Sequence, residues 1–233
     1  MLYEDTCSNE LLDLIREIQA GELLSNYLLV GGTSLSLQLG HWISVDIDLF
    51  TLNEQDNEGI LDYLSAHYNN IEIINNKKKI LQLKVKNTNI DFVKATGKLI
   101  QEPIYENGLK LCHKEDIAGM KLNVINSTTG RKTAKDYIDI AYLIEDMSLG
   151  KMFDIYKWKF DKDDVYNVKK DLSEVYKVNP HEWQEIIMIN KDIFVSDVPK
   201  IIKNAIEEYN KDNNLTFKDS LRNNALFRLF FRK

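Results

Sequence analysis

Two aspartates in the first quarter of the chain have the spacing of a metal site. Asp46 and Asp48 alternate with Val45, Ile47 and Leu49. In a β-strand spanning these residues, alternate side chains point to opposite faces, so both carboxylates would share one face. Burying two unpaired carboxylates in so apolar a run is costly, and a bound cation resolves that cost. Paired carboxylates suit Mg²⁺, which prefers oxygen ligands. A solvent-facing pair is the alternative interpretation.

A third carboxylate, Asp91, follows on another predicted strand. Residues 80–86 alternate apolar and polar side chains, and residues 87–89 supply a turn into residues 90–93. This pattern predicts a β-hairpin with Asp91 on its second strand. Beside the first two aspartates, Asp91 would complete a two-metal site, in which one ion activates an attacking oxygen and the other stabilises a leaving pyrophosphate.

A glycine turn lies about 16 residues before the paired aspartates. Gly31 and Gly32 end the apolar run 27–30, and we expect Thr33 or Ser34 to cap a helix that follows and ends near residue 40. Glycines let backbone N–H groups approach a phosphate closely, and the positive end of a helix favours that anion. The turn therefore predicts a phosphate site.

These residues need a mixture of strands and helices to position them. Hydrophobic spacing predicts helices at residues 9–20, 60–68, 115–125 and 132–146, and strands at residues 27–30, 45–50, 71–74, 80–86 and 90–93. Beyond residue 150 the pattern becomes long polar helices with no clear strand. We therefore expect a catalytic domain over residues 1–150 and a helical C-terminal region over residues 151–233.

Composition excludes several classes of protein. The chain has 233 residues, 44% of them hydrophobic, and two cysteines, which excludes intrinsic disorder and a disulfide scaffold. We expect no membrane segment and a cytoplasmic location, because no window approaches about 18 apolar residues and the acidic N-terminus is unlike a signal peptide. Histidines and cysteines form no zinc spacing. Neither a P-loop lysine nor a Gly-x-Gly-x-x-Gly pattern is present, which disfavours an NTPase or a dinucleotide-binding protein.

Net charge is unevenly distributed. The total is −6, but residues 1–70 hold twelve acidic side chains and one basic one, whereas the other 163 residues hold 29 bases and 24 acids. The densest basic stretch flanks Asp91 and comprises Lys77, Lys78, Lys79, Lys84, Lys86, Lys94 and Lys98. This stretch is where a polyanionic acceptor would lie; a solvated protein surface is the alternative.

Several motifs together resemble the AbiEii/AbiGii toxin branch of the DNA polymerase β-like nucleotidyltransferase superfamily. The family's first motif is matched by residues 29–35, 39–41 and 44–50 of this chain. The family's third-carboxylate strand is matched by residues 90–92, and its lysine helix by residues 116–122. Its closing acidic motif is matched by residues 135–140. They occur in the family's order over residues 26–146. The resemblance implies an α+β fold, with a nucleotidyltransferase-type mixed β-sheet flanked by helices and a mainly α-helical C-terminal region.

The resemblance also implies roles for individual residues. It places the nucleotide phosphates at the glycine turn, on Gly31, Gly32, Thr33 and Ser34. It makes Asp46 and Asp48 metal ligands, while Asp91 completes the metal site or acts on the attacking hydroxyl.

Later motifs supply the remaining side chains. Lys121 would neutralise charge on the triphosphate, and Asp136, with Asp139 as a further candidate, would orient that lysine or touch substrate. Taken from its residues alone, a lysine on the polar side of an apolar helix suits either phosphate neutralisation or plain solvation. The family commonly has a basic residue after the Gly-His pair, where this chain has Trp42. A stacked base or a hydrophobic plug is expected there, and His41 is expected to be structural.

The function implied is transfer of NMP from an NTP to an acceptor hydroxyl, with Mg²⁺ or Mn²⁺ as cofactor. The family suggests the toxin of a bacterial toxin–antitoxin or phage abortive-infection system, with RNA or tRNA as acceptor and an antitoxin protein as partner. Nucleotidylation of a small molecule such as an antibiotic, or of a protein hydroxyl, is the second hypothesis. A nucleotide-binding module without catalysis is the third.

Overall fold

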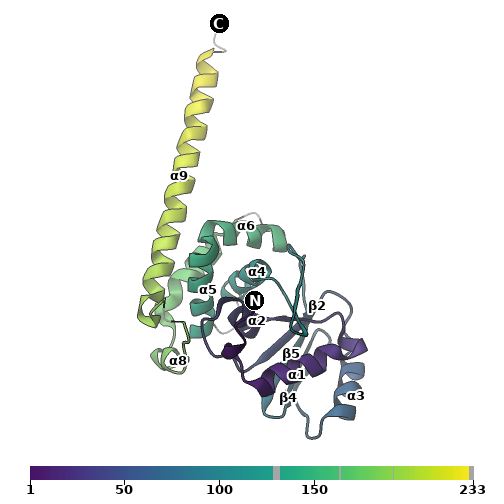
Figure 1. Cartoon of the computed structure of the whole chain (residues 1–233). Helices are drawn as coiled ribbons and strands as arrows, with labels where there is room; N and C mark the ends of the chain where they lie inside the picture. The colour runs from purple at the N-terminus through teal and green to yellow at the C-terminus, as the bar shows by residue number, and fades with distance from the viewer. Residues whose placement is uncertain (128–131, 163, 191, 231–233) are drawn as a thin grey trace.

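The fold was taken from a computed structural model, which describes residues 1–127, 132–162, 164–190 and 192–230, with side chains described up to residue 214. Within these ranges one β-sheet is flanked by helices (Figure 1). The strands are β1 (Leu28–Val30), β2 (Ile47–Thr51), β3 (Glu72–Lys77), β4 (Ile80–Val85), β5 (Thr88–Lys94), β6 (Ile104–Glu106) and β7 (Leu109–Leu111). The helices are α1 (Asn9–Ala20), α2 (Gly31–Leu39), α3 (Asn57–His67), α4 (Lys114–Ile125), α5 (Ala134–Met147), α6 (Leu149–Phe160), α7 (Tyr166–Leu172), α8 (Pro180–Gln184) and α9 (Val198–Phe230).

The sheet is mixed, as the sequence predicted. Its seven strands are ordered β3-β4-β5-β2-β1-β7-β6. The pairs β2/β5 and β1/β7 are parallel, and the other neighbouring strands are antiparallel. The parallel pairing of β2 with β5 sets Asp48 directly beside Asp91. The fold thus joins two carboxylates that lie 43 positions apart in the sequence.

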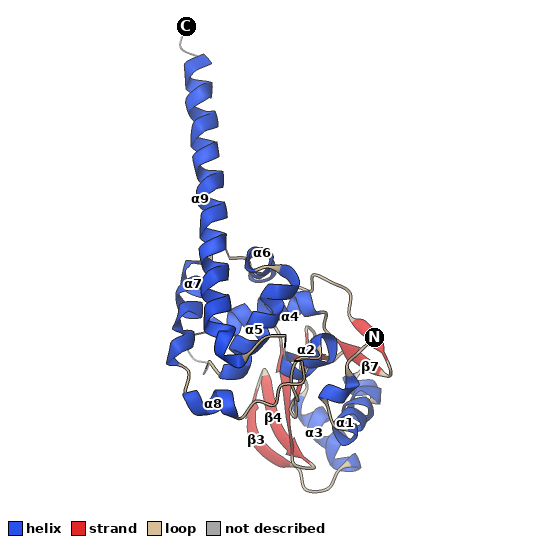
Figure 2. Cartoon of the chain, turned by 60° about the vertical axis from the view of Figure 1, so that its left-hand side comes forward, coloured by secondary structure: helices blue, strands red, loops and turns tan. Residues whose placement is uncertain are grey.

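Strand alternation divides the apolar side chains between the two faces of the sheet. Leu49 and Phe92 belong to the core that contains the buried side of α1 and α3. Phe50 belongs instead to the core that α4 and α5 share with the C-terminal helices. Helices lie on both faces of the sheet in Figure 2. Because successive side chains alternate, Asp48 and Asp91 point towards the face that carries α4 and α5.

The start of α2 differs from the predicted cap. The helix begins at Gly31, directly after β1, and its N-cap is Val30. The prediction that Thr33 or Ser34 caps this helix is therefore wrong. Gly31 has a φ of +66°, which lets the chain turn from strand to helix without an intervening loop. Gly40 ends the helix in the left-handed conformation, as predicted.

Two further differences concern strands. β2 begins at Ile47, so Asp46 precedes the strand. Of the two aspartates predicted to share a strand face, only Asp48 lies on the strand. The hairpin β6-β7 was not predicted, because each of its strands has only three residues. Its turn is formed by Asn107 and Gly108, both with positive φ. An Asn-Gly pair is the strongest short hairpin signal in a sequence.

The described part of the chain after residue 150 is mainly helical, as predicted. α6 packs along α4, and its residue Phe153 lies in the same core as Ile138 of α5 and Ile202 of α9. The distal part of α9 projects away from the rest of the molecule (Figures 1 and 2). The boundary at residue 150 remains a prediction. In the part of the chain that the structure describes, no helix combines the length and apolarity needed to cross a membrane.

Candidate active site

A row of polar side chains crosses the middle of the sheet. Gln82 on β4 lies opposite Asp91 on β5, Asp91 lies beside Asp48 on β2, and Asp48 lies opposite Val30 at the end of β1. The next residue, Gly31, starts α2. The sheet register therefore delivers two carboxylates to the beginning of a helix.

Gly31 is required at this junction. A Cβ atom on it would lie 2.1 Å from Oδ2 of Asp48, and its φ of +66° disfavours any other residue. The N–H groups in the first turn of a helix have no partner within the helix, and this end carries a partial positive charge. The start of α2 thus provides anion-binding groups next to Asp48.

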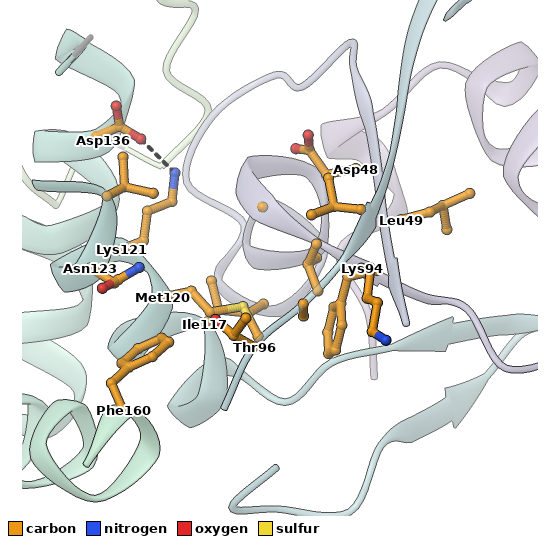
Figure 3. Close-up of a pocket in the computed structure, with 16 residues that line it drawn as sticks. Asp48, Leu49, Lys94, Thr96, Ile117, Met120, Lys121, Asn123, Asp136 and Phe160 are labelled. Carbon is orange, nitrogen blue, oxygen red and sulfur yellow. Dashed lines mark hydrogen bonds and ion pairs between the residues drawn. The ribbon is translucent and has the colours of Figure 1, made fainter. Parts of the chain in front are cut away.

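Asp48 borders two cavities. One has a volume of about 430 Å³ and is lined by Gly31, Asp48, Lys121 and Asp136 together with mostly apolar side chains. Figure 3 shows Lys121 and Asp136 on the opposite side of this cavity from Asp48. The other cavity, of about 380 Å³, is lined by Asp46, Ile47, Asp48, Ile74, Gln82, Asn89 and Asp91. All three predicted metal ligands therefore line one cavity, and Asp48 also lines its neighbour.

The carboxylate of Asp48 has no compensating contact with the residues that the structure describes. Burial and, secondarily, the charge of Asp91 raise its pKa to about 7, and Lys121 only partly opposes this effect. Within the described ranges, no residue donates a hydrogen bond to it or forms an ion pair with it, and Lys121 acts on it only through its charge. Its negative charge is consequently costly until a cation or proton arrives.

Asp91 is held from the neighbouring strand. Gln82 donates a hydrogen bond from Nε2 to Oδ2 of Asp91 at 2.7 Å, and Asn75 donates to Oε1 of Gln82 at 3.1 Å. Burial raises the pKa of Asp91, the Gln82 hydrogen bond opposes this, and the charge of Asp46 adds to it. One carboxylate oxygen is therefore fixed by a relay that starts on the edge strand β3.

Asp46 has polar contacts of its own. Asn89 donates a hydrogen bond to its Oδ1 at 3.0 Å, and Nζ of Lys135 lies 3.8 Å from its Oδ2. Among the described residues, no group of three His, Cys, Asp or Glu side chains is gathered closely enough to hold a metal ion. The donor set still fits a divalent cation in its chemistry, since three carboxylates line one cavity and Asp48 has no hydrogen-bond or ion-pair partner among the described residues.

Lys121 reaches the cavity from α4. Its Nζ lies 2.9 Å from Oδ1 of Asp136 and 2.7 Å from Oδ2 of Asp139, and the residue is only 9% exposed. Burial by itself lowers the pKa of Lys121, but the charges of Asp139 and Asp136 outweigh it and raise that pKa above its ordinary value. Lys121 is therefore a buried cation paired with two carboxylates, and the alternative of a solvated surface lysine does not apply.

Asp136 has a second role at the start of α5. Its Oδ2 accepts hydrogen bonds from the backbone N–H and the hydroxyl of Thr133, which completes a capping box. Its Oδ1 pairs with Lys121. This geometry favours an orienting role for Asp136, although the residue also lines the larger cavity.

Asp139 lies one turn further along α5 and is fully buried. Its Oδ1 contacts Nε2 of His41 at 2.8 Å and accepts a hydrogen bond from Nε1 of Trp42 at 2.9 Å. Burial alone would raise the pKa of Asp139, but the charge of Lys121 and the contact with His41 lower it to about 2. Trp42 is 3% exposed, so its ring offers no open face to a nucleobase.

The remaining residues of the glycine turn contribute backbone more than side chains. The hydroxyl of Thr33 is buried, contacts Oγ of Ser44 at 2.6 Å and donates to the carbonyl of Asp46. The Ser34 hydroxyl is also buried and faces the carbonyl of Cys112. Neither hydroxyl lines the cavities at Asp48. Thr33 instead fastens the segment that carries Asp46.

Six of the seven lysines of the predicted basic stretch fall into two groups, and the seventh, Lys84 on β4, is half-buried. Lys86, Lys94 and Lys98 pair with Glu17, Glu54 and Asp161. The side chains at the tip of the β3-β4 hairpin, Lys77, Lys78 and Lys79, are exposed.

Comparison with solved structures identifies the fold. A crystal structure of a provisionally assigned nucleotidyltransferase from H. pylori matches with a TM-score of 0.58 at 16% identity, covering 88% of this chain and 96% of that one. JHP933 from Helicobacter pylori matches with a TM-score of 0.56 at 18% identity, covering 94% and 99% of the two chains. No curated protein matches the sequence. At these identities the likeness shows a shared fold.

The family is established by the sequence itself. Residues 13–188 match the family described as nucleotidyl transferase AbiEii toxin, type IV toxin–antitoxin system. This match spans well over half of the chain and includes every site residue described above. The chain belongs to the AbiEii family of nucleotidyltransferase toxins.

Proposed function

We propose that the protein transfers NMP from an NTP to a hydroxyl group of RNA, with tRNA as the leading candidate, and that the reaction requires Mg²⁺ or Mn²⁺. The observation that carries the proposal is the meeting of three features around the larger cavity. These are the start of α2, the carboxylate of Asp48 and the buried Lys121. Asp91, which lies beside Asp48 in the sheet, lines the smaller cavity that Asp48 also borders. Anion-binding backbone, acidic side chains and a fixed cation are what triphosphate chemistry needs.

In this arrangement the nucleotide phosphates lie at the start of α2, where Gly31 allows close approach, and Lys121 neutralises part of their charge. Asp46, Asp48 and Asp91 would hold the divalent cation, which supplies further charge neutralisation to the triphosphate and the leaving pyrophosphate. The acceptor oxygen forms a bond to the α-phosphorus as the bond to pyrophosphate breaks. We assign the hydroxyl proton to Asp91, because its raised pKa makes it a stronger base than an ordinary carboxylate.

RNA is favoured as acceptor by the exposed lysines at the β3-β4 tip. Lys77, Lys78 and Lys79 leave their charges available for phosphates. The strand β4, which begins at this tip, carries Gln82, the residue opposite Asp91 on β5. We place the reaction in the cytoplasm, in a toxin–antitoxin or phage abortive-infection system with an antitoxin as partner. The family description supports the antitoxin.

The test incubates purified protein with each α-labelled NTP, Mg²⁺ and total cellular RNA. Asp48→Ala is the inactive variant, and Asp62→Ala, at an exposed position on α3, is its matched control. Label in RNA with wild type and Asp62→Ala, and none with Asp48→Ala, is the expected result. Label on protein or on a small molecule instead would replace the RNA acceptor.

Charge reversal separates acceptor binding from nucleotide binding. Replacing Lys77, Lys78 and Lys79 with Glu is expected to reduce RNA labelling, most strongly at low salt, while calorimetric binding of the NTP is unchanged. Unchanged RNA labelling in the triple variant would remove the hairpin tip from the acceptor surface.

A further inference from the structure

We propose that Trp42 and His41 are positioning residues that fix Lys121 for the nucleotide by acting through Asp139. The inference rests on the proposed function, since it takes Lys121 as the side chain that meets the triphosphate. Neither Trp42 nor His41 lines the cavity at Asp48, so neither touches the nucleotide there. Their effect on the site passes through one buried carboxylate.

The contacts of Asp139 divide between its two oxygens. Oδ1 lies 2.8 Å from Nε2 of His41 and 2.9 Å from Nε1 of Trp42. Oδ2 lies 2.7 Å from Nζ of Lys121. Because a carboxylate is planar, two N–H groups on Oδ1 fix the plane and thereby the position of Oδ2. The lysine ammonium is then held between this oxygen and Asp136.

Burial makes the arrangement stiff. His41 and Asp139 are 0% exposed, and Trp42 is 3% exposed. In such surroundings an unmade hydrogen bond is not replaced by water, and each remaining bond is strengthened by the low dielectric. A long lysine side chain would otherwise sample many rotamers, each with a different position for its ammonium. The contacts through Asp139 restrict the rotamers that Lys121 can adopt.

The geometry also assigns the ring proton of His41. Its Nδ1 is buried with no hydrogen-bond partner among the described residues, whereas Nε2 faces Asp139. A proton on Nδ1 would leave a buried donor unsatisfied, so we place the proton on Nε2. His41 and Trp42 therefore both donate to Asp139.

Trp42 connects the lysine to the start of α2. A Cβ atom on Gly32 would lie 2.7 Å from Cζ2 of the Trp42 ring, so the indole lies against the backbone of the glycine turn. The same indole donates its N–H towards Asp139. One side chain thus touches both parts of the phosphate site, the helix start and the carboxylate that holds Lys121.

The test uses variants that remove single N–H groups. Trp42→Phe keeps an aromatic ring and removes the indole donor, and Trp158→Phe makes the same change at a half-exposed tryptophan on α6. His41→Leu removes the imidazole donor, whereas His41→Gln can restore an N–H. Binding of the preferred NTP and of its nucleoside monophosphate is measured by calorimetry, with thermal melting to confirm that each variant is folded.

Trp42→Phe and His41→Leu are expected to weaken NTP binding about threefold to tenfold, as loss of one hydrogen bond of ordinary net strength predicts, and to change monophosphate binding little. His41→Gln should recover part of the lost NTP affinity, and Trp158→Phe should bind NTP as tightly as wild type. In Lys121→Ala, adding Trp42→Phe should cause no further loss. Equal weakening of NTP and monophosphate, or additive losses in the double variant, would overturn the inference.

Failure of the inference and failure of the proposed function look different. If Lys121→Ala weakens NTP binding but Trp42→Phe does not, the positioning role is wrong and the proposed function stands. If Lys121→Ala leaves NTP binding unchanged, the role of Lys121 in the proposed function is wrong, and the inference is overturned with it.

Discussion

Replacing Asp48 with Asn should stabilise the metal-free protein while it abolishes transfer. In the folded chain the pKa of Asp48 is about 7, against an ordinary value of 3.8. Because the folded-state pKa is raised, the folded state binds the proton more tightly than the unfolded state. Ionised Asp48 therefore destabilises the fold at pH 8, and this destabilisation shrinks as the pH falls from about 7 towards about 4.

The size of the effect follows from the two pKa values. About three pH units at about 1.36 kcal/mol each give roughly 4 kcal/mol as an upper bound. Asp48 is partly open to its cavities, so solvent screening reduces this to about 2 kcal/mol. For a chain of this length, 1 kcal/mol corresponds to about 2 to 4 °C in Tm. We therefore expect Asp48→Asn to melt about 4 to 8 °C above wild type at pH 8.

The assay is thermal melting of both proteins in EDTA at pH 8 and pH 5, with Asp62→Asn as control for the loss of one exposed carboxylate. The advantage of Asp48→Asn should shrink by more than half at pH 5. Added Mg²⁺ should raise the Tm of wild type more than that of the variant. The reasoning is refuted if Asp48→Asn melts below wild type at pH 8, or if its advantage is the same at both pH values.

Two further predictions concern the supports of the site, and a third concerns a buried ion pair between Lys159 of α6 and Asp116 of α4. Gly31→Ala should lower the free energy of unfolding by at least about 1 kcal/mol in urea titration and should abolish transfer, since the residue has positive φ and no room for Cβ; an active, equally stable variant would contradict the junction described. Gln82→Leu, which frees Asp91, should slow transfer about tenfold without weakening NTP binding; a change in binding alone would contradict the relay. Lys159→Met leaves the fully buried Asp116 without its ion pair, so a loss of about 3 to 5 kcal/mol is expected in urea titration; a loss below about 1 kcal/mol would show that the pair is dispensable.

The sequence was sufficient for features that depend on local pattern. Strand alternation and the hairpin signal placed Asp48 and Asp91 on strands, and the parallel pairing in the structure confirmed an α+β sheet that brings them together. The start of α2 was misjudged because Gly31, with its positive φ, turns the chain into a helix before any Ser or Thr can cap it. Asp46 was placed on the strand because its apolar neighbours continue the alternation, yet Val45 is 56% exposed and the strand begins later.

Asp139 was a candidate from the sequence, but its contacts with His41 and Trp42 behind Lys121 lay beyond sequence reasoning. His41 and Trp42 are separated from Asp139 by nearly a hundred residues, and only the packing of α5 against the segment after α2 brings them into contact. The sequence did contain one hint, since an aspartate one turn after Asp136 falls on the same side of the helix. No local pattern could show that its partner would be an indole N–H.

The central claim is nucleotidyl transfer at the cavity between α2 and α4, and paired labels test it most directly. The preferred NTP is supplied labelled at the α-phosphorus in one reaction and at the γ-phosphorus in another, each with the acceptor RNA and Mg²⁺. Our account predicts that α-label enters the RNA with release of one pyrophosphate per transfer, that γ-label never does, and that Asp48→Ala abolishes both products. Incorporation of γ-label, or of α-label undiminished in Asp48→Ala, would contradict it.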